Sequence, residues 1–232
     1  MTTLTTTLRA IGLLLWKDIV VEIRAGELLY ATLLFAGIVV LLFSFAFLGG
    51  SPPTIEVMSG VLWVALSLSG MLGISRSFER ERESDTLRGL LLSPVPRPAL
   101  YLAKLLSISL LMCLVIAVVL PGLGLLFGLS PGGHLAQLLL LLVLGVIGFS
   151  AVAALFGAAL GRARAREVLL PILVYPLIVP VLLAGTRGTY ALLYGTPEAL
   201  ADAGRWLRFL TVFDILAVMG GLWLFEPLCA AE

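Results

Sequence analysis

The sequence predicts an all-α integral membrane protein with six transmembrane helices and an N-terminal interfacial amphipathic helix. Of the 232 residues, 60% are hydrophobic and only 12% are charged, whereas an ordinary soluble domain is about half apolar and a quarter charged. Six apolar stretches are long enough to cross about 30 Å of hydrocarbon as helices. They leave too few residues for a separate globular domain, so residues 1–232 are expected to form one membrane domain.

The N-terminal segment, residues 1–27, has the pattern of an amphipathic helix. Its apolar residues recur at intervals of three or four: Leu8, Ile11, Leu15, Ile19 and Ile23. Charged residues fall largely between them, as in a helix that lies in the membrane interface. The alternative is that residues 1–27 only extend the first transmembrane span. A signal peptide is excluded, because charges interrupt the apolar run and no small-residue cleavage site follows it.

The six spans follow in order, and glycine or proline marks several of their ends. They cover residues 28–48, 57–75, about 100–120, 135–160, 168–184 and about 206–228. A Gly-Gly-Ser-Pro-Pro sequence ends the first span, and Pro121 with a glycine-rich tail ends the third. Lys104, near one end of the third span, can extend its ammonium group to the headgroups. Ala153, Gly157 and Gly161 form a small-residue stripe that predicts close helix packing.

The last two spans carry further backbone signals. Pro171, Pro176 and Pro180 lie in the fifth span, where each removes a helix hydrogen bond and favours a bent, movable element. Residues 196–198, Thr-Pro-Glu, have the order of an N-cap, a first-turn proline and a first-turn acid. A short external helix is therefore expected to begin there, before the sixth span.

The connections alternate in their content of lysine and arginine. The N-terminal segment and the loops at 76–99 and 161–167 together hold eleven of these residues, whereas the three connections on the other side hold three. Basic residues are retained on the cytoplasmic side of a membrane. Both termini are therefore expected in the cytoplasm.

The segment 76–98, RSFERERESDTLRGLLLSPVPRP, is the richest in candidate functional residues. Charges of alternating sign fill its first half, the following leucines place an apolar ridge on one helical face, and three prolines end that helix. Such a helix suits insertion into a groove of a partner protein. The alternative is an ordinary charged loop whose leucines dip into the interface. The candidate docking residues are Phe78, Glu79, Glu81, Glu83, Leu87, Leu90 and Leu91.

Two isolated polar residues are further candidates. Asp214 is the one carboxylate well inside a predicted span. A charge there costs roughly 2.5 to 3.5 kcal/mol, so it should face the bundle or a wet cavity and find a partner in Arg205, Arg208 or another span. A substrate-path or gating site and a structural interhelical bond both account for it. His134, in a turn on the outer side, could ligate a haem iron, although a histidine in a surface turn is the commoner case.

The motifs do not favour an enzyme. Neither Lys17 nor Lys104, the two lysines of the chain, follows a glycine, so the phosphate-binding Gly-Lys-Ser/Thr loop is absent from the sequence. One histidine cannot form a paired-histidine zinc helix, and no Gly-x-Ser-x-Gly sequence occurs. Cys113 and Cys229 lack disulfide or zinc spacing. A net charge of +1 offers no field for binding nucleic acid. We therefore expect no catalytic residue and no metal site.

The loop ERESDTLRGLLLSPVP, the six spans and the N-terminal helix resemble the membrane subunits of ABC-2-type exporters. More narrowly, the chain is similar over nearly all its length to the CcmB family, the haem exporter B permeases of cytochrome c maturation. The most specific stretch is SGVLWVALSLSGMLGISRSFERERESDTLRGLLLSPVPRPALYLAKLL, followed by LLPILVYPLIVPVLL and FDILAVMGGLWLFEPLCAAE. Members usually carry glycine before Thr or Ser in the loop and often an acid after the leucine, whereas Asp85 and Arg88 stand here.

The resemblance implies a permease subunit of the bacterial inner membrane that has no ATPase of its own. The implied partners are a cytoplasmic ATPase subunit (CcmA), the membrane proteins CcmC and CcmD, the haem chaperone CcmE at the outer face, and a second permease copy. Haem is a possible cargo, and ATP belongs to the partner. ATP-driven closure would push the helix at 79–92 and tilt spans two and three. The alternatives are a permease for another hydrophobic compound and a passive assembly subunit.

Overall fold

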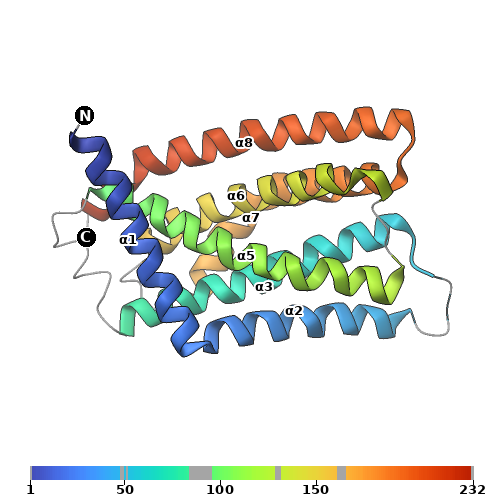
Figure 1. Ribbon diagram of the computed structural model, residues 1–232, viewed down its shortest axis with the longest axis horizontal. Helices are drawn as coiled ribbons and strands as arrows, with labels where there is room; N and C mark the ends of the chain where they lie inside the picture. Colours follow the sequence, from blue (N-terminus) through green and yellow to red (C-terminus); the bar gives the residue numbers. More distant parts are fainter. Residues whose placement is uncertain are drawn as a thin grey trace.

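The chain folds into a bundle of long helices (Figure 1). The computed structural model describes residues 2–47, 50, 52–83, 96–128, 132–160 and 166–230. The elements are α1 (Thr2–Ala25), α2 (Glu27–Ala46), α3 (Ile55–Glu83), α5 (Arg97–Phe127), η1 (Gly132–His134), α6 (Leu135–Ala159), α7 (Arg166–Tyr194) and α8 (Pro197–Ala230). Across these residues the regular structure is helical, and six helices are long and apolar enough to cross a membrane. The predicted all-α, six-span fold class is confirmed.

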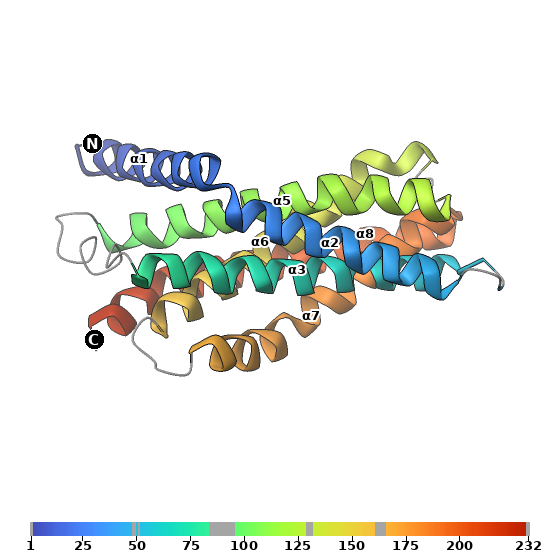
Figure 2. The ribbon, with the colours of Figure 1, turned by 90° about the horizontal axis from the view of Figure 1, so that it is seen from below.

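The spanning helices alternate in direction, so their ends gather at two ends of the bundle. Figures 1 and 2 show the N-terminus, the end of α3, the start of α5 and the end of α8 at one end, which we call the terminal end. The last turns of α2, α5 and α7 lie at the opposite end, the far end. Both flanks of the segment 84–95 therefore lie on the same side of the bundle as the two termini.

The N-terminal helix α1 is a separate element and not an extension of the first span. Gly26 ends it with a φ of 65°, a left-handed conformation that glycine adopts without strain. The carboxylate Oε1 of Glu22 then accepts the backbone N–H of Leu29 at 2.7 Å, which satisfies a donor in the first turn of α2. Figure 1 shows α1 (dark blue) running obliquely across the bundle and over α5. Its position in a membrane interface stays a prediction.

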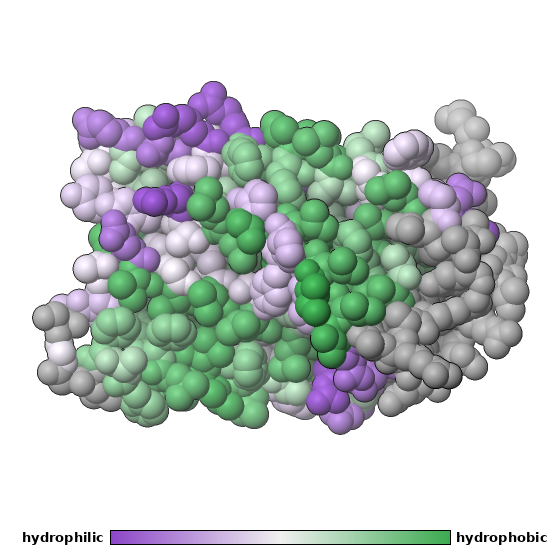
Figure 3. Space-filling view, turned by 180° about the vertical axis from the view of Figure 1, so that it is seen from behind, coloured by the Kyte–Doolittle hydropathy of each residue, from purple (hydrophilic) through white to green (hydrophobic). Residues whose placement is uncertain are grey.

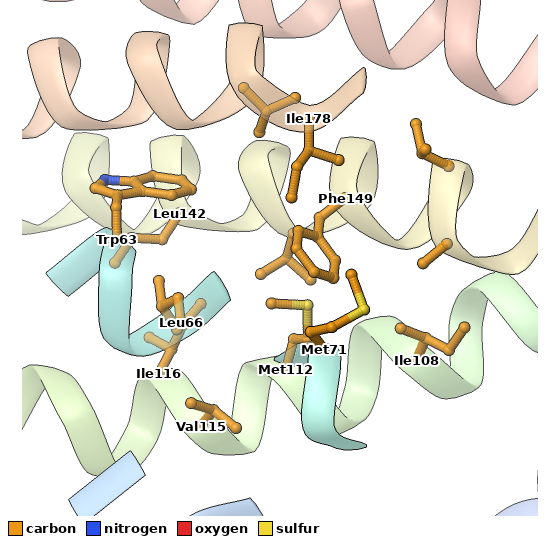
Figure 4. Packing of buried hydrophobic residues seen from close by; sticks show 14 of the residues in the cluster. Trp63, Leu66, Met71, Ile108, Met112, Val115, Ile116, Leu142, Phe149 and Ile178 are labelled. Carbon is orange, nitrogen blue, oxygen red and sulfur yellow. The ribbon is translucent and has the colours of Figure 1, made fainter. Parts of the chain in front are cut away.

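Helices α3 and α6 form the centre of the bundle. Of their spanning windows, 67% and 72% are buried, compared with 17% to 33% for the other four spans. Apolar side chains from four helices meet there (Figure 4): Trp63, Leu66 and Met71 of α3, Ile108, Met112, Val115 and Ile116 of α5, Leu142 and Phe149 of α6, and Ile178 of α7. Figure 3 shows hydrophobic side chains over the middle of the rear face, as expected for a surface in contact with lipid.

Trp63 fixes the spacing of α3, α6 and α7. Its indole Nε1 donates a hydrogen bond to the Thr189 hydroxyl on α7 at 3.0 Å. A Cβ atom at Gly145 on α6, or at Gly185 on α7, would lie 2.2 Å from the indole ring. Because neither position has room for a methyl group, α6 and α7 approach the ring through their glycines.

Several helices are longer than the sequence predicts. We expected the fifth span to end at residue 184, but α7 continues to Tyr194 without interruption through its three prolines. The polar residues that make this stretch look like a loop are satisfied within the bundle, since the hydroxyl of Thr186 donates to the Leu182 carbonyl and that of Thr189 accepts from Trp63. The third span likewise continues through Pro121 to Phe127.

The start of the sixth span also differs from the expectation. Thr196 caps a helix as predicted, with its hydroxyl 3.4 Å from the Ala199 backbone N–H. That helix is not a separate external one, because α8 runs without a break from Pro197 to Ala230. The expected long connection before the sixth span is therefore reduced to residues 195–196, and Arg205 and Arg208 lie within α8.

Candidate functional site

The predicted docking segment is described only at its two flanks. Residues 76–83 continue α3 as helix, and Arg97 begins α5. Glu79 is half-buried at the end of the bundle and lies 3.6 Å from Arg76, one helical turn away. The other candidates lie outside the described side chains: Glu81, Glu83, Leu87, Leu90 and Leu91. Their docking role stays a prediction.

Phe78 occupies a different place from its neighbours in the segment. Its side chain is 1% exposed, and a Cβ atom at Gly157 on α6 would lie 2.1 Å from its ring. The ammonium group of Lys104 on α5 lies 5.3 Å from the ring centroid, within the range of a cation–π contact. Phe78 therefore joins α3 to α5 and α6 and is not exposed for contact with a partner. The predicted small-residue stripe is confirmed at Gly157, whereas Gly161 lies outside the described residues.

The exit of the docking segment is tied to the last helix. The Arg97 guanidinium donates a hydrogen bond to the Glu226 backbone carbonyl at 3.2 Å, and it lies 4.0 Å from the Glu226 carboxylate. Both side chains are partly exposed, so the ion pair contributes on the order of 0–1 kcal/mol. The contact mainly positions the helices, because it holds the start of α5 against the end of α8.

Asp214 lies where α8 packs on α6, as its position inside a span predicts. The residue is 6% exposed, and a Cβ atom at Gly148 would lie 2.6 Å from its Oδ1. Neither carboxylate oxygen has a hydrogen-bond partner among the described residues. The expected arginine partners are engaged elsewhere, since Arg205 pairs with Asp202 and Arg208 donates to the Gly204 carbonyl.

Tyr101 is a polar residue of the same interface that the sequence reasoning missed. Its hydroxyl donates to the Ala151 carbonyl of α6 at 3.2 Å and lies 3.5 Å from the Ala217 carbonyl of α8. Ala217 follows Asp214 by three residues, so this carbonyl lies about one turn along α8 from Asp214. A tyrosine in an apolar span gives no sequence signal of this kind, because its aromatic ring reads as core.

His134 ends the short helix η1 at the far end and is only partly buried. Across the described residues, no group of three His, Cys, Asp or Glu side chains comes together in a way that could hold a metal ion. A role of His134 in binding haem iron stays a prediction.

A second polar cluster joins α1 to α5, and it too was not predicted. The Asp18 carboxylate accepts from the ammonium groups of Lys17 at 3.0 Å and Lys104 at 3.4 Å. Burial by itself raises the pKa of Asp18, but Lys104, Lys17 and a hydrogen bond from Ser107 outweigh it, so the pKa lies below its ordinary value. Lys104 thus binds an acid of α1, and its reach toward the headgroups stays a prediction.

The profile of one protein family, described as "CcmB protein", matches residues 9–223, which include the five described spans from α2 to α7 and most of α8. The chain belongs to the CcmB family. Its relatives include the "Heme exporter protein B" of Pseudomonas aeruginosa, which is 32% identical over 216 residues covering 91% of this chain and 95% of the relative. The protein of the same name from Rhodobacter capsulatus is 32% identical over 192 residues, 81% and 87% of the two chains. That of Paracoccus denitrificans is 33% identical over 175 residues, 75% and 79%.

The CcmB match extends over every candidate discussed above. It begins at Arg9 in α1 and ends at Trp223, nine residues after Asp214. Residues 76–98 and His134 also fall within it. Most of the N-terminal helix α1 therefore falls within the CcmB match. Assignment to a family of permease subunits agrees with a membrane protein that is not itself an enzyme.

Proposed function

We propose that this chain is the transmembrane subunit of an ABC transporter that exports haem for the maturation of c-type cytochromes. The observation that carries the proposal is the match to relatives named heme exporter protein B over 91% of the chain. The six-helix bundle supplies the membrane-crossing part that such a subunit needs. Haem is then the cargo of the complex, and no cofactor is assigned to this chain.

ATP hydrolysis is assigned to a separate cytoplasmic subunit of the CcmA type. The 232 residues contain no glycine-lysine pair and therefore no phosphate-binding loop. The docking surface for that subunit is the segment that begins at Glu79 and ends with residue 92. Its acidic side chains would face the ATPase, and its leucine ridge would enter a groove of that subunit.

The flanks of this segment support its role in coupling. At its entry, Phe78 packs against Gly157 of α6, and at its exit Arg97 binds Glu226 of α8. A displacement of the segment by the ATPase would therefore act on α6 and α8 as well as on α3 and α5. Interlocked cores switch between discrete packings and do not deform continuously, which favours a two-state transition.

We place the chain in the bacterial inner membrane with both termini in the cytoplasm. The terminal end of the bundle carries most of the basic residues, which favours the cytoplasmic side for that end. The complex would include two permease copies, membrane proteins of the CcmC and CcmD types, and a CcmE-type haem chaperone at the far end. Asp214 is proposed as a polar site on the α6–α8 interface, and His134 faces the side of the chaperone.

Complementation tests the proposed function. The gene is expressed in a bacterial strain that lacks its own CcmB, and covalently attached haem in c-type cytochromes is measured on a gel. Restored cytochrome formation is the expected result. Co-purification of an ATPase without any restored cytochrome would instead indicate a permease for another hydrophobic compound.

Charge reversal tests the coupling. The variant Glu79→Arg, Glu81→Arg, Glu83→Arg is compared with the wild type in the purified complex with its ATPase, and the rate of ATP hydrolysis is measured. We expect that the permease-dependent part of the rate is lost while α-helix content is kept. An equal rate in both complexes would support a passive assembly subunit.

A further inference from the structure

Asp214 lies in the middle of the last span and faces the inside of the bundle. It is 17 residues from the start of α8 and 16 from its end, or about 25 Å along the helix in either direction. The residue is 6% exposed, whereas Val212, Ile215 and Leu216 beside it are exposed on the outer face of α8. A partner chain that covers this outer face therefore does not reach the carboxylate.

Within the described residues, no donor of the neighbouring helices binds the Asp214 carboxylate. The helices packed against α8 are α5, α6 and α7, and the described α6 carries no charged side chain. The charged and titratable groups with described side chains on the other helices are Arg97, Tyr101, Lys104 and Cys113 of α5, Glu167, Tyr175, Arg187, Tyr190 and Tyr194 of α7, and Glu198, Asp202, Arg205, Arg208 and Glu226 of α8. None of these described groups forms a hydrogen bond with Asp214. The two tyrosines buried in the bundle, Tyr101 and Tyr175, donate to backbone carbonyls instead.

The backbone around Asp214 offers acceptors and no free donors. A Cβ atom at Gly148 on α6 would lie 2.6 Å from its Oδ1, so the carboxyl group rests on the α6 backbone. In the middle of a helix each N–H already donates to the carbonyl four residues before it, whereas each carbonyl oxygen keeps a second lone pair. A carboxylate only accepts and therefore finds no partner there. A protonated carboxyl group has one O–H, which it can donate to a helix carbonyl.

A bound metal cation does not fit the same position. Hard cations take about six or more oxygen ligands. Across the described residues no three His, Cys, Asp or Glu side chains come together, and the hydroxyl of Ser150, two residues beyond Gly148, forms no hydrogen bond. A charge without a partner is costly in an apolar span. The proton is therefore the ligand that the packed interface accommodates.

We propose that Asp214 is a proton-binding site, which holds its proton while α8 packs on α6 and releases it when the two helices separate at Gly148. Release leaves a carboxylate on Asp214 and transfers the proton to water. Because the two equilibria are linked, the proton stabilises the packed interface to the same extent as packing strengthens proton binding. The inference goes beyond haem export and does not depend on it.

Carbon-13 NMR of the full chain in detergent, labelled at the aspartate carboxyl carbons, tests the proposal. The chain has four aspartates, Asp18, Asp85, Asp202 and Asp214, and the chemical shift of this carbon differs between an acid and a carboxylate. We expect one acid signal at neutral pH that persists to pH 8 and is absent in Asp214→Asn. The matched control is Asp202→Asn on the same helix, where the exposed side chain pairs with Arg205. That variant should lose a carboxylate signal and keep the acid signal.

Gly148→Ala tests the link between the proton and the packing. Its Cβ atom would displace Asp214 and the Phe213 ring, which lies 3.1 Å away, and so push α8 from α6. The acid signal should then convert to a carboxylate signal at a lower pH than in the wild type. Gly220→Ala, where a Cβ atom meets nothing within 4 Å, should leave the signal unchanged. Circular dichroism shows whether each variant is folded, and the wild-type signal decides the protonation state if Gly148→Ala does not fold.

Three results would overturn the proposal. The first is a carboxylate signal for Asp214 at neutral pH in the folded wild type. The second is an acid signal that converts when sodium is added at constant pH, which would indicate a cation site. The third is conversion at the same pH in the wild type and in folded Gly148→Ala, which would remove the link to packing. A carboxylate signal together with normal cytochrome formation would leave the proposed haem export intact.

Discussion

Replacement of Gly157 by alanine should loosen the joint between α3 and α6. The added Cβ atom would lie 2.1 Å from the Phe78 ring, whereas carbon atoms pack at about 3.5–4.0 Å. The ring must therefore move by about 1.5 Å, and at 1% exposure it has no open space to enter. Overpacking of this kind costs about 1–3 kcal/mol. Alanine also favours the helix by about 0.5–1 kcal/mol, so a net loss of up to about 2.5 kcal/mol is expected.

The matched control is Gly220→Ala in α8, where a Cβ atom meets nothing within 4 Å. Both variants gain the same helix propensity, so the difference between them isolates the overpacking term of about 1–3 kcal/mol. The assay is thermal unfolding in one detergent, followed by circular dichroism. Cytochrome formation in the complementation strain should fall with Gly157→Ala and stay normal with Gly220→Ala.

Phe78→Ala in the Gly157→Ala background tests whether the clash with the Phe78 ring causes the loss of stability. Removing the ring also removes the clash, so the effect of Gly157→Ala should shrink or change sign in that background. Equal melting temperatures for Gly157→Ala and Gly220→Ala would refute the close contact. So would an effect of Gly157→Ala that is the same with and without the Phe78 ring.

Three further predictions concern the other polar contacts. Asp214→Asn should keep the melting temperature, because the amide has the same shape, but lower cytochrome formation; an unchanged yield would remove Asp214 from the functional residues. Trp63→Phe should cost about 1 kcal/mol for the lost hydrogen bond alone, plus a packing term, and should have no hydrogen-bond component in a Thr189→Val background, as a double-mutant cycle would show. The pKa of Asp18 lies below its ordinary 3.8, so its stabilisation of α1 is present above pH 3.8 and is lost as the pH falls through the lowered value. The difference in melting temperature between wild type and Asp18→Asn should therefore begin to shrink as the pH falls below 3.8, and a difference that is still constant below that pH would contradict the pairing with Lys104.

The spans are predictable from the sequence because lipid imposes a simple rule. Every backbone group must be bonded within the segment, so apolar length alone locates a helix. The ends of the helices depend on side-chain partners and are harder to predict. Thr186 and Thr189 read as loop residues, yet their hydroxyls bind a helix carbonyl and the Trp63 indole, and α7 continues for ten residues past the expected end. The Trp63 partner of Thr189 is 126 residues away in the sequence and becomes visible only once the helices are packed.

The candidate site was predictable where one residue breaks a strong pattern. Asp214 is conspicuous as an acid in an apolar span, and its burial on α6 follows from the cost of exposing a charge to lipid. Its lack of an arginine partner was not predictable, because Arg205 and Arg208 find closer acceptors on their own helix. The same holds for Lys104, whose partner Asp18 is 86 residues away. Pairing between helices depends on the packing register, which composition and periodicity do not encode.

The contacts at the terminal end connect the docking segment to the α6–α8 interface. Phe78 and Gly157 join its entry to α6, and Arg97 joins its exit to the end of α8. Asp214 lies between these two helices. On α6 it contacts Gly148, which is nine residues before Gly157, and on α8 it is twelve residues before Glu226. A push that separates the flanks of the segment must therefore either break one of the two contacts or change the spacing of α6 and α8. Under the proposed coupling, contacts that hold would transmit such a push to the packing around the buried Asp214 carboxylate.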